Sequence, residues 1–286
     1  MLHWRLLLGF TFIVALVALC WLDHVIPLPG AVLMPLAIVL VLLAGDEMLR
    51  MLAAVGMRPS PGAVHAGNFL LVVSSWISIG EAAPGTLTLL ALGIVVFFVF
   101  AAEIRRYEAP GKATANAAAG LFAVVYVGLL MSFAVTLRMI WGVGALASLL
   151  IVVKFGDTGA YTVGRLVGRH KLAPQISPGK TIEGALGGLV FSAVGSWATF
   201  HWLVPLMAGR PPGESGWGWL VFGLAVSAAG MLGDLAESLI KRDAGQKDSS
   251  RRFLSNSFGG VLDLLDSLLL AAPVAYAFWA FGLVGR

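Results

Sequence analysis

Residues 233–267 read GDLAESLIKRDAGQKDSSRRFLSNSFGGVLDLLDS and border two long apolar stretches of the chain. Acidic and basic side chains crowd this segment: Asp234, Glu237, Lys241, Arg242, Lys247, Asp248, Arg251, Arg252, Asp263 and Asp266. A carboxylate at the edge of hydrocarbon costs several kcal/mol unless it is paired, solvated or bound to metal. We therefore expect this segment to fix how the last two helices meet, and its aspartates to hold a divalent metal ion against phosphates.

The composition places the chain in a membrane. Hydrophobic residues make up 59% of the 286 residues and charged residues only 12%, and the mean hydropathy is +0.91. Such a chain is typical of integral membrane proteins. We expect an all-α, polytopic protein of about nine transmembrane helices, because nine apolar runs are near the length that crosses a bilayer. These runs cover residues 6–22, 25–44, 68–83, 84–103, 115–136, 139–156, 184–207, 217–235 and 260–283.

The basic residues orient this arrangement, since Lys and Arg gather in the cytoplasmic loops of membrane proteins. With a cytoplasmic N-terminus, all but three of the 19 Lys and Arg residues fall on the inside; Arg138, Arg210 and Arg286 fall outside. The C-terminus is then expected outside. A basic cytoplasmic face suits anionic lipid headgroups or nucleotide phosphates. Nucleic acid is not expected as a partner, because no basic soluble domain is present to bind it.

Polar residues divide the chain into two parts. Residues 1–153 are expected to form a transmembrane scaffold whose charges lie in loops, with residues 46–57 as an amphipathic segment at the membrane interface. From Lys154 onward polar residues enter the apolar runs. Residues 154–286 are therefore expected to form the catalytic region, with its metal and nucleotide site at the cytoplasmic face.

The first polar segment of this region, residues 154–188, predicts a helix followed by a phosphate-binding turn. Lys154, Asp157 and Tyr161 share one helix face, either as a structural ion pair or as part of a site, while glycines at 164 and 168 allow another helix to pack closely. We interpret residues 177–181 as a turn in which Thr181 caps a helix that begins near Ile182. The free N–H groups of such a helix start attract phosphate.

Helical spacing gives the second segment a similar meaning. Asp234, Ser238 and Lys241 fall four and three residues apart, so they share one face, as do Asp263 and Asp266 on the following span. Magnesium prefers oxygen ligands and retains waters and substrate phosphates, so these carboxylates predict a metal site. Glycines at 259 and 260 would let the backbone approach a phosphate.

These spaced residues resemble the phosphatidate cytidylyltransferases, also called CDP-diacylglycerol synthases. The C-terminal signature of that family is matched by Ser238, Lys241, Arg242, Lys247, Asp248, Gly259, Gly260, Asp263 and Asp266. Its upstream motifs are matched by Ser177, Pro178, Lys180, Thr181, Glu183, Gly184, Gly233, Asp234 and Leu235. The resemblance covers roughly residues 154–270. The chain departs from the family pattern at Phe258 and Leu264, where the family usually has His and Arg, and we expect Arg251 and Arg252 to compensate.

The resemblance implies a nucleotidyltransferase of phospholipid biosynthesis that joins CTP and phosphatidic acid to give CDP-diacylglycerol and pyrophosphate. It implies Asp234, Asp263 and Asp266 as ligands of one or two magnesium ions, and Lys241 beside them as catalytic. The substrates would be bound by Ser177, Lys180, Thr181, Ser238, Arg242, Lys247, Asp248, Gly259 and Gly260. The expected location is the inner (plasma) membrane, with the active site facing the cytoplasm and a cleft that opens sideways to lipid.

Other functions stay open at this point. A relative could act on another lipid, as an ether-lipid cytidylyltransferase or a CTP-dependent polyprenol kinase. A secondary transporter would use the same acids as coupling sites, although no inverted repeat is visible. A catalytically silent homologue is a further alternative, and the sequence leaves open whether the chain forms a homodimer.

Overall fold

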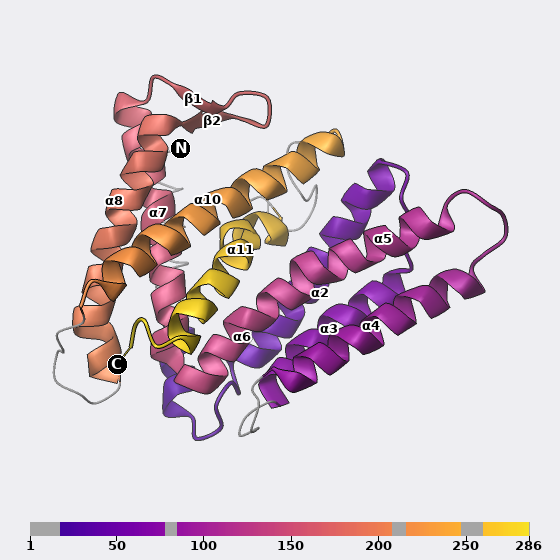
Figure 1. Ribbon diagram of the computed structural model, residues 1–286, viewed down its shortest axis with the longest axis horizontal. Coiled ribbons are helices and arrows are strands. Elements are labelled where there is room, and N and C mark those ends of the chain that lie inside the picture. Colours follow the sequence, from indigo (N-terminus) through magenta and orange to yellow (C-terminus); the bar gives the residue numbers. More distant parts are fainter. Residues whose placement is uncertain (1–17, 78–84, 208–215, 247–259, 286) are drawn as a thin grey trace.

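The computed structural model describes residues 18–77, 85–207, 216–246 and 260–285 of the chain, and most of them are helical (Figure 1). After a helical stretch at 18–25, the helices are α2 (Leu33–Ala54), α3 (Pro61–Ile77), α4 (Thr86–Arg105), α5 (Ala113–Ala123), α6 (Leu130–Trp141), α7 (Val143–Val167), α8 (Ile182–Ala198), α9 (Val204–Met207), α10 (Gly218–Asp243) and α11 (Val261–Ala280). Two π-helical turns, η1 (Val124–Leu129) and η2 (Thr199–Leu203), join α5 to α6 and α8 to α9. The all-α class is confirmed, with one small hairpin added to it.

Six helical stretches among the described residues are long and apolar enough to cross a membrane. They are Thr86–Arg105, Ala113–Trp141, Val143–Val167, Ile182–Met207, Gly218–Asp243 and Val261–Ala280. Each corresponds to one of the nine predicted spans. The predicted span at 6–22 lies largely outside the described residues, and the count of nine and the orientation of the termini stay predictions.

The structure corrects the N-terminal boundaries. The span predicted at 25–44 begins only at Leu33, after a non-helical stretch that contains Pro27 and Pro29, and α2 then continues to Ala54. The predicted interfacial segment at 46–57 is therefore wrong as a separate element. Its apolar side chains Met48, Met51 and Leu52 are buried in the core, while Val55 is exposed. The span predicted at 68–83 is α3, which starts at Pro61, a residue that suits the first position of a helix.

Two helices extend beyond the predicted apolar runs, and both carry polar residues there. The run predicted to end at 156 continues as α7 to Val167, and the run predicted to end at 235 continues as α10 to Asp243. The end of an apolar run marks where polar residues begin and not where the helix ends. Backbone hydrogen bonds between residues four apart continue through polar residues as well. The extensions place Asp157 on α7, and Ser238 and Lys241 on α10, within regular helices.

Glycines bring α7 and α8 into close contact along most of their length, and the two helices lie side by side in Figure 1. A Cβ atom placed on Gly187 would lie 2.5 Å from the Cβ of Val163, and one on Gly159 would lie 2.5 Å from the Cβ of Phe191. Real side chains do not approach this closely, so only glycine permits this spacing. Gly164, predicted to allow close packing, lies in this interface, with its Cβ position 3.4 Å from Cα of Gly184 on α8.

A two-stranded antiparallel hairpin lies where α7 ends and α8 begins (Figure 1). Its strands are β1 (Lys171–Ala173) and β2 (Ser177–Thr181). The turn predicted at 177–181 is therefore wrong, because these residues pair with β1 as a strand. The predicted cap is confirmed: the Thr181 hydroxyl accepts a hydrogen bond from the N–H of Gly184 at 3.1 Å. The carboxylate of Glu183 accepts hydrogen bonds from the backbone N–H groups of Arg169 and His170, which holds the hairpin to the start of α8.

The scaffold also holds charges inside the protein, which corrects the expectation that they lie only in loops. Arg138 of α6 is buried, and its Nε donates to Oδ2 of Asp23 at 2.6 Å. Asp23 accepts further hydrogen bonds from the N–H groups of Val32 and Leu33, at the start of α2. A buried Arg is retained only when it is paired in this way. This ion pair therefore fixes the beginning of α2 against the end of α6.

We expect Gly187→Ala to loosen the contact between α7 and α8 and to cost about 1–3 kcal/mol, as overpacking does elsewhere. The midpoint of thermal unfolding in detergent should fall by several degrees. Gly93→Ala is the matched control, because Gly93 lies within helix α4 and nothing approaches its Cβ position within 4 Å. It should be neutral or stabilising, since Ala favours helix over Gly. Equal midpoints for both variants would contradict the packing role.

Candidate active site

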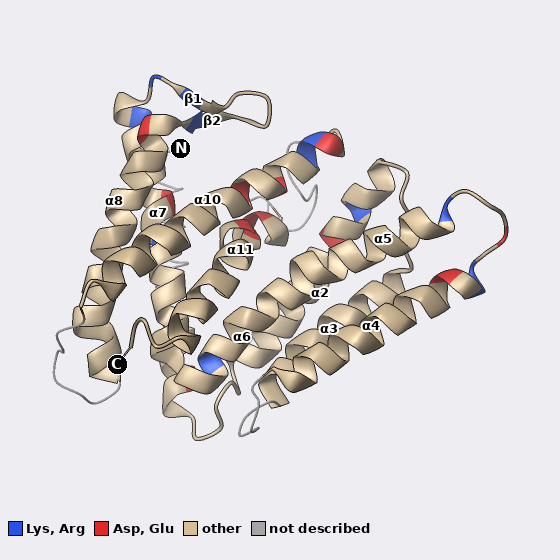
Figure 2. Cartoon of the chain, in the orientation of Figure 1, with Lys and Arg blue, Asp and Glu red and all other residues tan. Residues whose placement is uncertain are grey.

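A cavity of about 640 Å³ lies between α7, the hairpin, α8, α10 and α11. Its polar lining comes from both predicted segments: Lys154, Asp157, Tyr161, Arg165, Ser177, Lys180, Thr181, Asp234, Asp263, Asp266 and Ser267. Figure 2 shows acidic positions on neighbouring turns of α10 and α11, on the side of the molecule where the hairpin lies. Carboxylates and cations far apart in the sequence therefore meet around one space.

The hairpin carries a basic side chain into this cavity. Lys180 on β2 forms an ion pair with Asp234 of α10, with 2.8 Å between Nζ and Oδ2. Strand pairing of β2 and the cap made by Thr181 fix the backbone on either side of Lys180. Its ammonium group is thus held at the wall of the cavity beside Asp234, where it could also bind an anionic group of a substrate.

Lys241 joins the last two helices. Its ammonium group forms close ion pairs with Glu237, one turn earlier on α10, and with Asp263 on α11. The second oxygen of Asp263 accepts the backbone N–H of Gly260 and so caps the start of α11. Glu237 is completely buried and the side chain of Lys241 is only 12% exposed. Such buried charges are costly unless paired, so Lys241 fixes Asp263 relative to α10.

Asp266 stands among other carboxylates. It is 8% exposed, and its Oδ1 accepts the hydroxyl of Ser267 at 3.0 Å. Asp234 and Asp157 line the same cavity, so their carboxylates repel its negative charge. Lys154 relieves part of this repulsion, since its Nζ lies 2.9 Å from Oδ2 of Asp157. Like charges gathered at a buried position favour the binding of a cation.

The scaffold positions α11 through one acid. Glu47 of α2 is 2% exposed, and its two carboxylate oxygens accept the backbone N–H groups of Val261 and Leu262 at 3.0 and 2.8 Å. These groups belong to the first turn of α11, where no intrahelical acceptor exists. The negative charge also complements the positive end of the helix. Glu47 therefore holds the turn from which Asp263 and Asp266 project.

The structure brings six of the predicted site residues together at the cavity: Ser177, Lys180, Thr181, Asp234, Asp263 and Asp266. Two others, Lys241 and Ser238, lie beside it. Lys241 bridges Glu237 and Asp263, and the Ser238 hydroxyl lies 3.5 Å from Oδ1 of Asp234.

Of the remaining predicted residues, Arg242 and Gly260 do not line the cavity. Arg242 is bound to backbone carbonyls, with its Nε 3.1 Å from the oxygen of Ile176, so it links α10 to the hairpin. Gly260 is the N-cap of α11. Lys247, Asp248 and Gly259 lie outside the described residues, as do Arg251, Arg252 and Phe258. Their predicted roles stay predictions.

Sequence reasoning missed Glu47 and Glu237 as parts of the site. Glu237 could have been found, because it precedes Lys241 by four residues on one helix. Glu47 also carried a signal, as an acid near the end of an apolar run, but its distance in the sequence hid its partner on α11. Ser267 follows Asp266 directly and offered no spacing pattern of its own.

The acidic side chains of the cavity are the candidate ligands for a magnesium ion. In the part of the chain that the structure describes, no three acidic, His or Cys side chains gather closely enough to hold a metal ion as they stand. The donor set nevertheless fits a hard cation, because Asp234, Asp263 and Asp266 line one cavity and the last of them is buried among like charges.

Comparisons with known proteins show the family to which the chain belongs. The sequence profile described as the cytidylyltransferase family matches residues 4–281. A protein named phosphatidate cytidylyltransferase from Staphylococcus aureus (strain COL) is 31% identical over 267 residues, which cover 91% of this chain and 94% of that protein. One with the same name from Chlamydia pneumoniae is 32% identical over 222 residues, covering 74% of this chain and 70% of that protein.

A third relative of that name, from Haemophilus influenzae, is 40% identical over 140 residues, or 49% of this chain and 47% of that protein. The chain belongs to the cytidylyltransferase family. The predicted resemblance to phosphatidate cytidylyltransferases is confirmed, and with it the expectation that the chain is an enzyme of this type.

We expect Glu47→Ala to leave two buried N–H groups without an acceptor, which costs about 1–3 kcal/mol for each group. The variant should unfold at a lower temperature and lose at least tenfold in turnover, because the start of α11 moves with its aspartates. Glu47→Gln, which keeps one acceptor oxygen, should recover part of both.

Glu108→Ala is the control for charge removal, because Glu108 is exposed beyond the end of α4. Thermal unfolding in detergent and steady-state kinetics would measure both effects. Wild-type turnover in Glu47→Ala would show that the cap does not support the site.

Proposed function

We propose that this protein transfers the cytidylyl group of CTP to phosphatidic acid, with formation of CDP-diacylglycerol and pyrophosphate. The single observation that carries the proposal is the cavity in which the cations Lys154 and Lys180 face the carboxylates of α10 and α11. The names of the relatives support the choice of substrates. The same proposal places the protein in phospholipid biosynthesis, as a multi-pass protein of the inner membrane whose site faces the cytoplasm.

The reaction needs positioning and charge neutralisation more than acid–base chemistry. A phosphate oxygen of phosphatidic acid attacks the α-phosphorus of CTP, and the bond from that phosphorus to the oxygen that bridges to the β-phosphate breaks. The attacking phosphate is already anionic at neutral pH, so no strong base is required. What limits the rate is the approach of two polyanions and the charge that develops on the leaving pyrophosphate.

The residues around the cavity suit these tasks. Lys180 would exchange its contact with Asp234 for a substrate phosphate, and Lys154, which also lines the cavity, would contact phosphate from α7. Lys241 would act by holding Asp263 in place, because its ammonium group is already engaged by two carboxylates. Asp234, Asp263 and Asp266 would bind one or two magnesium ions, which neutralise phosphate charge and polarise the phosphorus–oxygen bonds.

The deciding experiment uses purified protein in detergent with phosphatidic acid, CTP labelled on the cytidine, and magnesium. We expect a labelled lipid that comigrates with CDP-diacylglycerol, and loss of its formation when a chelator removes magnesium. An ether-linked phosphatidic acid and a polyprenol serve as competing acceptors. Release of labelled CDP with the polyprenol alone would point to a kinase, because a kinase transfers the terminal phosphate and leaves the labelled cytidine on the nucleotide. No labelled lipid from any acceptor would refute the proposal.

We expect Lys180→Ala to raise the KM for one of the two substrates by about tenfold, because a charge-assisted contact to phosphate contributes about 1.5–3 kcal/mol. Lys171→Ala is the matched control, since Lys171 lies on the partner strand of the same hairpin and does not line the cavity. Its kinetic constants should match those of the wild type. If the two variants behaved alike, Lys180 would not be a phosphate ligand.

A further inference from the structure

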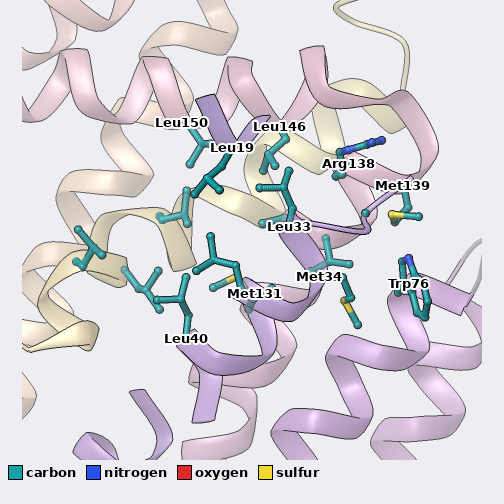
Figure 3. Close-up of a pocket in the computed structure, with 18 of the residues that line it drawn as sticks. Leu19, Leu33, Met34, Leu40, Trp76, Met131, Arg138, Met139, Leu146 and Leu150 are labelled. Atoms are coloured by element: carbon teal, nitrogen blue, oxygen red, sulfur yellow. The ribbon is translucent and has the colours of Figure 1, made fainter. Parts of the chain in front are cut away.

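A second cavity lies within the helical bundle, between α2, α6, α7 and α11. Its volume is about 220 Å³, and apart from Lys154 and Arg138 its lining side chains are apolar or aromatic. Figure 3 shows Trp76, Met139 and Arg138 together at one end of this space, with Leu150 and Leu40 away from them. Arg138 is engaged by Asp23, so it does not offer a free charge to the cavity. The space suits a hydrocarbon chain.

The apolar cavity meets the polar cavity at one residue. Lys154 lines both of them, at the middle of α7. On α11, Asp263 and Asp266 line the polar cavity while Leu264 and Leu265 line the apolar one. The two spaces therefore share the wall formed by the first turns of α11. A molecule with a phosphate in the polar cavity could extend a chain past Lys154 into the apolar cavity.

The dimensions match part of one acyl chain. Along α7 the apolar cavity extends from Leu146 to Lys154, which is about 12 Å at 1.5 Å per residue. This is a little under half of the roughly 30 Å hydrocarbon thickness of a bilayer. Leu33 and Leu40 of α2 and Leu150 of α7 are only half-buried, so the cavity is not sealed and a chain could enter it from the side.

We propose that this apolar cavity binds one acyl chain of the phosphatidic acid substrate and makes the enzyme selective for the length of that chain. The inference rests on the proposed function for the identity of the lipid. It places one acyl chain inside the protein, while the other stays in the bilayer. The phosphate would then lie in the polar cavity, the glycerol near Lys154 and one acyl chain in the apolar cavity. This is the order of these groups along the lipid molecule.

The selectivity must come from how well the acyl chain packs in the cavity and not from the hydrophobic effect. A lipid tail in the bilayer is already in hydrocarbon, so its transfer into an apolar cavity gains little from the hydrophobic effect. A chain that ends inside the cavity and one that exceeds it differ in packing against the walls. Narrowing the cavity should therefore affect long chains more than short ones.

The test narrows the cavity and compares two chain lengths. Ala134 of α6 is 4% exposed and lines the cavity, so Ala134→Phe fills part of it. Ala37→Phe narrows it from α2 and serves as a second variant if the first does not fold. The quantity measured is the ratio of kcat/KM for dioleoyl phosphatidic acid to kcat/KM for dioctanoyl phosphatidic acid. Turnover of the short-chain lipid shows that each variant is folded.

We expect this ratio to fall at least fivefold in Ala134→Phe or Ala37→Phe. Gly93→Phe is the control, because Gly93 lies on α4, faces outward and does not line the cavity. Its ratio should equal that of the wild type. An unchanged ratio in both cavity variants would overturn the proposal, and would indicate that the space holds bulk lipid or that both chains stay in the bilayer.

A binding experiment separates this proposal from the proposed reaction. A phosphatidic acid analogue with a photoreactive diazirine at the end of one acyl chain is crosslinked to the wild type, and the labelled peptides are identified. We expect labels on the cavity residues of α6 and α2. Labels on these residues in a protein that does not form CDP-diacylglycerol would refute the proposed reaction and support the acyl-chain site. Turnover with labels only on outward faces such as that of α4 would refute the acyl site and keep the reaction.

Discussion

A carboxylate inside an apolar helical bundle must find a donor, and this constraint shapes the protein at every level. Asp23 is bound by Arg138, Glu47 by the first N–H groups of α11, and Glu237 and Asp263 by Lys241. Each contact joins segments that would otherwise meet only through apolar side chains, which pack in many registers. Because an unpaired buried charge is so costly, the ionic contacts select one register. The helices that carry the site are thereby fixed relative to the scaffold.

The glycine interface of α7 and α8 supplies the second constraint. Backbones that approach closely enough to exclude a Cβ atom leave little freedom in the angle between two helices. The hairpin lies at the common end of these two helices. Glu183 of α8 accepts hydrogen bonds from the backbone N–H groups of Arg169 and His170, which holds the hairpin in place. The backbone of Lys180 is therefore fixed relative to Asp234, although Lys180 lies on a short strand outside the helices. Precise positioning of a cation matters for a reaction in which two anions must approach each other.

Two cavities of opposite character share one wall in this arrangement. The residues of α11 alternate between them, since Asp263 and Asp266 line the polar space while Leu264 and Leu265 line the apolar space. A helix can do this because residues one apart project in directions that differ by about 100°. A lipid substrate has the same division into a charged head and hydrocarbon tails. The fold thus places both halves of such a molecule within reach of one helix.

The sequence by itself determined the membrane class, the family and the helical faces that carry Asp234, Lys241, Asp263 and Asp266, because hydrophobicity and helical spacing are local properties. It also determined the Thr181 cap, which depends on residues three apart. Tertiary structure alone decided the rest. Glu47 caps a helix more than two hundred residues away, and the strand at 177–181 forms only by pairing with β1. The apolar cavity is defined by helices that no local pattern brings together, since long-range packing depends on which surfaces remain to be buried once each helix has formed.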